Sequence, residues 1–129
     1  TVARIVGIET VVHGTITGLE NDMTTVTVGK TQIIVLAAGP VGSEVSLCIR
    51  GEDVILQEAS KRTSGIRNQL PGRIREMLRE GPMVRVLVDC GFLLTAVITR
   101  RTWEELRLRE GGPVTVLVKA AAIHVIPRG

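Results

Sequence analysis

The chain has 129 residues, a formal net charge of +3 and 44% apolar residues, but aromatic residues make up only 2% of it. One Trp, one Phe and no Tyr cannot form the stacking platform that binds single-stranded nucleic acids or oligosaccharides. The composition therefore argues against a partner of that kind and predicts a core of Val, Ile and Leu.

A similar pattern opens each half of the chain. Residues 7–14 read G-I-E-T-V-V-H-G and residues 65–72 read G-I-R-N-Q-L-P-G, and matching strand-like stretches follow in the same order. Self-similarity of this kind predicts a tandem duplication. The two copies differ in charge, because Glu9 in the first corresponds to Arg67 in the second.

Both halves contain short stretches with β-branched residues at alternate positions, and glycines are expected at the corners between them. These stretches predict an all-β chain of two small antiparallel barrels of about five strands each, at residues 1–62 and 63–129. One helix start is expected within residues 99–106, T-R-R-T-W-E-E-L, where Thr102 and Glu105 have the spacing of a capping box.

Catalytic motifs are missing from the sequence. It has no glycine-rich phosphate loop followed by Lys and Ser or Thr, no G-x-S-x-G and no H-E-x-x-H. The neighbouring carboxylates at residues 52–53 and 104–105 are better explained by exposure at a corner and in a helical turn than by acid-base chemistry. The chain is therefore not expected to be an enzyme.

The two cysteines and two histidines offer no metal site. Cys48 and Cys90 lie in apolar stretches of different halves and are expected to be buried free thiols. His13 and His124 have no Cys or carboxylate at ligand spacing. A disulfide between the halves has little support from this pattern.

No signal peptide opens the chain, and no apolar run is long enough to span a membrane. These features predict a cytoplasmic chain with no direct membrane insertion. Its start at Thr1, without Met, suggests a piece of a longer protein.

Groups that bind anions gather in the second half. Arg67 follows hydroxyls and a glycine at residues 63–65, and its guanidinium can contact two oxygens at once. Thr99 and Thr102 flank the predicted helix start, where free N–H groups favour anions. Lys119 ends a strand and precedes three alanines. Each feature also has an ordinary explanation, as a surface ion pair, a helix cap or a solvated strand end. Their joint occurrence favours a site for a small tetrahedral dianion.

The second half resembles the molybdate-binding Mop or TOBE domain family. That family's successive motifs read S-A-R-N-x-L-x-G, A-x-I-T, L-x-L-x-x-G and I-K-A-S-x-V. They match residues 65–72, 95–99, 106–111 and 118–123 in order and spacing. The first half is similar, at residues 2–14, to the entry into the C-terminal domain of importer-type ABC ATPases.

The resemblance implies two tandem OB-like five-stranded Greek-key barrels, often with a strand exchanged between them, and one short helix in the second half. It also implies that molybdate or tungstate binds at an interface between two chains, with no covalent cofactor and no metal ion held by the protein. The family has Ser at the positions of Gly65 and Ala121, so two of its hydroxyls are missing. The implied oxyanion-binding residues are Ser64, Gly65, Arg67, Thr99, Thr102, Lys119 and Ala120.

The same resemblance implies the regulatory domain of the ATP-binding subunit of a molybdate or tungstate ABC importer, in which the bound oxyanion inhibits import. The expected partners are a second copy of the chain, the ATPase domain and the membrane permease, at the cytoplasmic face of the inner membrane, and no nucleic acid. Two alternatives stay open: a free-standing molbindin for intracellular molybdate storage, and a ligand-free structural TOBE domain of another ABC importer. The sequence does not rank molybdate against tungstate.

Overall fold

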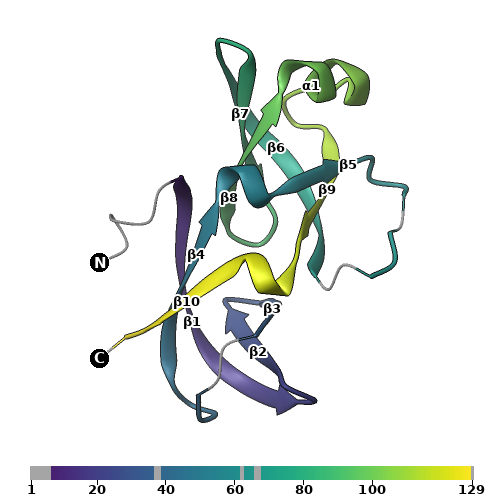
Figure 1. Ribbon diagram of the computed structural model, residues 1–129. Coiled ribbons are helices and arrows are strands. Elements are labelled where there is room, and N and C mark those ends of the chain that lie inside the picture. Colours follow the sequence, from purple (N-terminus) through teal and green to yellow (C-terminus); the bar gives the residue numbers. More distant parts are fainter. Residues whose placement is uncertain (1–6, 37–38, 62, 66–67, 129) are drawn as a thin grey trace.

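The computed structural model describes residues 7–36, 39–61, 63–65 and 68–128. Within these ranges the chain forms two five-stranded antiparallel sheets and one short α-helix, α1 (Arg100–Leu106), in the second half (Figure 1). The strand order is β10-β4-β1-β2-β3 in the first sheet and β5-β9-β6-β7-β8 in the second. The all-β class, the two five-stranded units and the short helix agree with the prediction from the sequence.

The strands follow the β-branched stretches closely. Those of the first sheet are β1 (Ile8–Glu20), β2 (Met23–Val28), β3 (Thr31–Val35), β4 (Glu44–Arg50) and β10 (Ile123–Pro127). Those of the second are β5 (Ile55–Gln57), β6 (Asn68–Glu80), β7 (Met83–Asp89), β8 (Leu93–Thr99) and β9 (Pro113–Val118).

Two strands cross between the halves of the sequence (Figure 1). β5 belongs to the first half but pairs with β9, with Ile55 opposite Leu117. β10, at the end of the chain, pairs with β4, with Ile123 opposite Ile49. Each sheet is therefore completed by an edge strand from the other half. The boundary between residues 62 and 63 describes the duplication in the sequence and stays a prediction.

Val, Ile and Leu side chains form a core that continues through both halves, as the composition predicted. In β2 and β7, fully buried residues such as Val26 and Val86 alternate with partly exposed ones. β4 and β9 are instead buried along five consecutive residues each, so both of their faces are covered. These strands lie one place in from the exchanged edge strands.

Gly14 and Gly72 lie inside β1 and β6, not at the corners where the sequence suggested glycines. A Cβ at Gly14 would lie 2.7 Å from the backbone oxygen of Thr27 and 2.7 Å from Val26 Cγ1. At Gly72 it would lie 2.6 Å from Val88 Cγ1. Glycine at both places allows the neighbouring strand to approach this closely.

Two short 3-10 turns connect the halves. η2 (Gly51–Asp53) leads from β4 into β5 and packs against β8, and η3 (Ala120–Ala122) leads from β9 into β10 and packs against β3. The residue before each turn has nearly the same backbone conformation, with φ −77° and ψ 136° at Arg50 and φ −69° and ψ 139° at Lys119. We call the contact of η2 with β8 the η2 junction and the contact of η3 with β3 the η3 junction.

Candidate functional site

Lys119 lies between the end of β9 and the start of η3, with its side chain exposed. Its backbone oxygen accepts a hydrogen bond from the N–H of Ala122 at 2.9 Å, which closes the turn. Ala120 is buried, at 6% exposure, and Ala121 is exposed. This end of β9 therefore presents an ammonium group beside small side chains.

Ser64 and Gly65 form an exposed turn ahead of β6. Asn68, the first residue of β6, pairs with Val118, so the turn and Lys119 lie at the same end of the β6–β9 pair. Gly65 has a φ of +86°, a conformation that Ser adopts rarely. This backbone explains why glycine replaces the Ser of the family pattern here. Arg67, the predicted guanidinium of the site, lies outside the described residues.

The segment before Gly65 is held by side-chain amides. Thr63 Oγ1 donates to Gln57 Oε1 at 2.8 Å, and the Gln69 side chain bonds to the backbone of Thr63. Because Gln57 belongs to β5 and Gln69 to β6, these contacts tie the turn to the two strands on either side of β9 in the second sheet. The position of Ser64 is therefore set by the exchanged strand as well as by β6.

The cap of α1 differs from the prediction. Thr99, the last residue of β8, is the N-cap, because its Oγ1 accepts the N–H of Thr102 at 3.1 Å and donates to Thr102 Oγ1 at 3.0 Å. The Arg100 N–H is also bonded, to the backbone oxygen of Pro82 at 2.9 Å. The predicted box from Thr102 to Glu105 is wrong, and two of the expected free N–H groups are already satisfied.

The structure does not bring these threonines to Lys119. Glu80, at the far end of β6, pairs with Met83, and Met83 pairs with Thr99. Figure 1 accordingly shows α1 at one end of the second sheet and the turn between β9 and β10 at the other. The predicted donors of one chain thus fall into two groups at opposite ends of a sheet.

The threonines instead line a cavity at the η2 junction. The cavity has a volume of about 320 Å³, and Glu52, Met83 and Val97 line it together with Thr99 and Thr102. From the sequence, Glu52 was expected only to be exposed at a corner. The duplication carried the relevant signal, since Glu52 occupies the same place after Arg50 as Ala121 does after Lys119.

Glu9 forms an ion pair that crosses between the halves. Its carboxylate binds Arg85 of β7, whose guanidinium also contacts Glu80 at 2.9 Å. The hydrogen bond from Arg85 to Glu80 and the charge of Glu9 raise the pKa of Arg85. The residue that corresponds to Arg67 is thus already engaged with a cation of its own chain.

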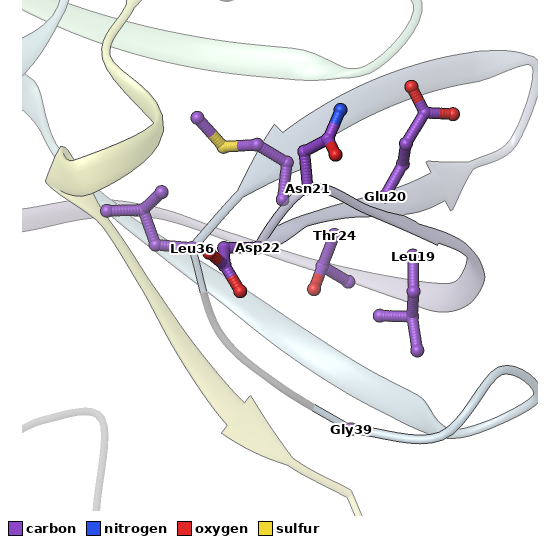
Figure 2. A pocket seen from close by; sticks show the side chains of 8 residues that line it. Leu19, Glu20, Asn21, Asp22, Thr24, Leu36 and Gly39 are labelled. Atoms are coloured by element: carbon purple, nitrogen blue, oxygen red, sulfur yellow. The ribbon is translucent and has the colours of Figure 1, made fainter.

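A second cavity, of about 420 Å³, lies in the first half of the chain, at the turn that connects β1 and β2 (Figure 2). Leu19, Leu36 and Gly39 line it, together with the carboxylates of Glu20 and Asp22. Among the predicted site residues that the structure describes, none lines this cavity. The described residues that line it include two carboxylates and no cation, which makes this cavity unsuited to a dianion.

Both thiols are free and buried, as predicted. Burial raises the pKa of Cys48 and raises that of Cys90 to about 11, so neither thiol is a nucleophile near neutral pH. Within the described ranges, no three His, Cys, Asp or Glu side chains are grouped so as to hold a metal ion. No helix in the described part of the chain has the length and apolar character needed to cross a membrane.

Two OB-like barrels with an exposed cationic end define a small β-sheet binding module. Residues 64–125 match the TOBE domain. Residues 64–125 therefore belong to the TOBE domain family, as the motifs indicated.

Relatives and a solved structure cover both halves. The chain is 33% identical over 127 residues to the "Molybdate/tungstate import ATP-binding protein WtpC" of Pyrococcus horikoshii, a match of 98% of this chain and 34% of the relative. It is 33% identical over 103 residues to the "Molybdenum import ATP-binding protein ModC" of Mannheimia succiniciproducens, covering 78% and 29%. The chain spans about a third of the length of these relatives. The cytoplasmic molybdate-binding protein ModG, solved with molybdate, aligns with a TM-score of 0.80 at 20% identity, over 95% of this chain and 98% of that one. This likeness supports the pair of OB-like barrels.

Proposed function

We propose that the chain is the regulatory oxyanion-binding domain of the ATP-binding subunit of a molybdate or tungstate ABC importer. The observation that carries the proposal is the pairing of Asn68 with Val118, which supports a shared site because the turn at Ser64 and Gly65 and the exposed Lys119 lie at the same end of this strand pair. Hydroxyl, backbone N–H and ammonium groups suit the four oxygens of a tetrahedral dianion. The names of the relatives support molybdate or tungstate as that dianion.

In the proposed site, one chain supplies Ser64, Gly65, Arg67, Lys119 and the backbone of Ala120. The hydroxyls of Thr99 and Thr102 lie at the opposite end of the same sheet, so they reach the anion only from a second copy. This arrangement supports the dimer interface that the family resemblance implies. The anion then holds two chains together through contacts that neither chain makes alone.

The proposed regulation follows from that link. An anion that binds only the joined arrangement shifts the transporter toward it by the difference in affinity between the two states. Abundant cytoplasmic molybdate or tungstate thus favours the resting, inward-facing importer and slows import. The ATPase domain and the permease are the partners in this proposal, at the cytoplasmic face of the inner membrane.

Isothermal titration calorimetry with molybdate, tungstate and sulfate tests the site. We expect heat from molybdate or tungstate, less from sulfate, and a loss of at least tenfold in affinity in Arg67→Ala and Lys119→Ala. The matched control is Arg50→Ala, which removes the cation at the corresponding place before η2 and is expected to leave binding unchanged. Absence of heat with both heavy oxyanions, or equal heat with sulfate, would contradict the proposal.

A free-standing molbindin is the second candidate, because ModG aligns over 98% of its own length and is a molybdate-binding protein by title. Analytical ultracentrifugation of the full-length protein with molybdate separates the two. A ring-like oligomer without an ATPase domain supports storage, whereas a dimer that carries an ATPase domain supports the importer subunit.

A further inference from the structure

The two halves share an equivalent backbone hydrogen bond at one end of each barrel. In the first half, the Gly42 N–H donates to the Ile16 oxygen at 2.8 Å. In the second half, the Gly111 N–H donates to the Ile74 oxygen at 2.7 Å. Both isoleucines are buried, and both mark the place where the register of their strand shifts, against β2 for Ile16 and against β7 for Ile74. The two bonds therefore identify the same place in the two barrels.

The connections that lead to these bonds differ in length. In the second half, residues 100–110 follow β8 and contain α1, which packs against β7 and β8 (Figure 1). In the first half, only residues 36–41 follow β3, and those that the structure describes there, residue 36 and residues 39–41, form no helix. Among the described residues, the first barrel therefore has no counterpart of α1.

The strand residue beneath α1 has an uncovered counterpart in the first barrel. Trp103 and Leu106 of α1 pack against the core, and Trp103 Nε1 lies 3.2 Å from Met77 Sδ. Leu19 corresponds to Met77, because each lies three residues after the isoleucine of the shared bond and pairs with the next strand of its sheet. Met77 is partly buried against the core, whereas Leu19 is 54% exposed.

The uncovered end of the first barrel is the cavity of about 420 Å³ at the turn between β1 and β2 (Figure 2). Leu19 lines it from β1, and Leu36, which is 50% exposed, lines it from the residue after β3. Large apolar side chains that stay exposed around a hollow are typical of a surface that another protein segment covers. The second barrel shows that a short helix fits such an end.

The charge around this cavity restricts which helix fits it. Glu20 and Asp22 line the cavity, and within the described ranges neither carboxylate forms an ion pair. At the second barrel a cation lies at this end instead, since the guanidinium carbon of Arg79 is 5.7 Å from the centroid of the Trp103 ring. Complementarity therefore favours a helix that brings Lys or Arg to the first barrel.

We infer that this cavity docks an amphipathic helix of the ATP-binding domain, with its apolar face on Leu19 and Leu36 and basic side chains facing Glu20 and Asp22. The inference rests on the proposed function, which places that domain in the same subunit. Relatives of this chain are about three times as long as the region they share with it, so most of such a subunit lies outside the chain. A second copy is not the source, because its α1 already covers its own second barrel.

Maleimide labelling of Leu19→Cys in the full-length protein, without molybdate, tests the inference. The native thiols are buried and do not compete for the reagent. The matched control is Leu78→Cys near the end of β6, because Leu78 is 57% exposed against 54% for Leu19. We expect labelling at position 19 to be about tenfold slower than at position 78. The helix belongs to the same subunit, so the difference should not depend on protein concentration.

A reversal of charge tests the basic edge of the helix. Glu20→Lys/Asp22→Lys in the Leu19→Cys protein is expected to bring labelling to the rate of the Leu78→Cys control, whereas Glu110→Lys, an exposed carboxylate of the second half, should leave it slow. Hydrogen exchange on the protein with native Leu19 guards against an effect of the Cys itself. The amides of residues 19–23 should exchange faster after the double reversal than in the wild type.

The outcomes separate the docking site from the proposed function. Equal labelling at positions 19 and 78, together with unchanged exchange of residues 19–23, would overturn the docking site. Protection that appears only at high protein concentration would also overturn it, because a second copy would then be the occupant. Calorimetry of the Leu19→Cys protein with molybdate reports on the oxyanion site alone. Heat with equal labelling would leave the proposed function standing, and protection without heat would leave only the docking site.

Discussion

The side-chain amide of Asn68 bonds to both backbone polar groups of Ile34. Its Nδ2 donates to the Ile34 oxygen at 2.9 Å, and its Oδ1 accepts the Ile34 N–H at 2.8 Å. Asn68 is only 2% exposed and begins β6, whereas Ile34 lies in β3, an edge strand of the other sheet. The Asn68 amide thus gives Ile34 the two hydrogen bonds that a neighbouring strand would provide at the open edge of β3. It also joins the two halves of the chain.

Asn68→Ala is expected to lower the free energy of unfolding by about 2–4 kcal/mol, because two backbone groups of a largely buried contact lose their partner. The measurement is urea unfolding followed by circular dichroism. The corresponding contact in the first half is single: the Thr95 N–H donates to Thr10 Oγ1 at 2.9 Å. Thr10→Val should therefore cost less, about 1–2 kcal/mol. Equal losses of unfolding free energy in the two variants would contradict the explanation that Asn68 contributes two hydrogen bonds and Thr10 one.

The control for both changes is Thr17→Val. Thr17 Oγ1 bonds to Thr27 Oγ1 at 2.8 Å, but this pair is exposed. Water replaces the lost partner there, so the change is expected to stay within about 0.5 kcal/mol. A loss as large as that of Asn68→Ala would show that threonine or amide removal in general, rather than the link between the sheets, lowers stability.

Gly14→Ala is expected to destabilise the fold by about 1–3 kcal/mol, since its Cβ would overlap atoms of β2 and force the strands apart. The backbone oxygen of Thr27, 2.7 Å away, cannot move without the strand. Gly18→Ala in the same strand is the control. Its Cβ would meet Thr25 atoms at 3.5 and 3.6 Å, ordinary contacts. The same unfolding measurement should leave that variant close to the wild type, and a similar loss in both would refute the steric explanation.

The strands could be predicted from the residue pattern, whereas the exchange of strands between the sheets was expected only from the family resemblance. Alternating β-branched residues specify a strand locally, so β2 and β7 were visible in the pattern. The short strands β5 and β10 have the same apolar character whichever sheet they join. Their partner is decided by the direction in which η2 and η3 lead the chain, and that direction depends on packing against β8 and β3.

Only part of the candidate site could be predicted from the sequence. The order of the motifs indicated Ser64 and Lys119, and the β6–β9 register places them at one end. The separation of Thr99 from Lys119 depends on the register of β6 with β7 and β7 with β8, which no local pattern reveals. The cap was misassigned because the spacing to Glu105 favoured Thr102, whereas pairing with Met83 holds Thr99 extended and makes it the N-cap.

Thr99→Ala is therefore expected to lower stability by about 1 kcal/mol through loss of the helix cap. Glu105→Ala should have almost no effect, because Glu105 makes only an exposed contact with Arg101 at 4.0 Å. Thermal unfolding, with Trp103 fluorescence reporting on α1, distinguishes the two. If Glu105→Ala were the more damaging change, the predicted capping box from Thr102 to Glu105 would be right and Thr99 would not be the cap.

The buried Cys90 thiol predicts a loss of stability at alkaline pH. Burial raises its pKa from 9.0 to about 11, and a backbone hydrogen bond at Phe92 lowers it by a smaller amount. Between these values the unfolded chain releases the proton and the native chain retains it, so the unfolded state binds fewer protons. The free energy of unfolding should then fall by about 1.4 kcal/mol for each pH unit in this window.

Urea unfolding of the wild type and Cys90→Ala from pH 8 to 11 isolates this contribution. Cys48, whose pKa burial also raises, is present in both proteins and cancels in the difference. The variant should be less stable by a constant amount below pH 9, where a small cavity replaces the sulfur. Above pH 9 the gap should narrow, because only the wild type has the Cys90 proton to lose on unfolding. A gap that stays constant to pH 11 would show that Cys90 titrates alike in the folded and unfolded chains.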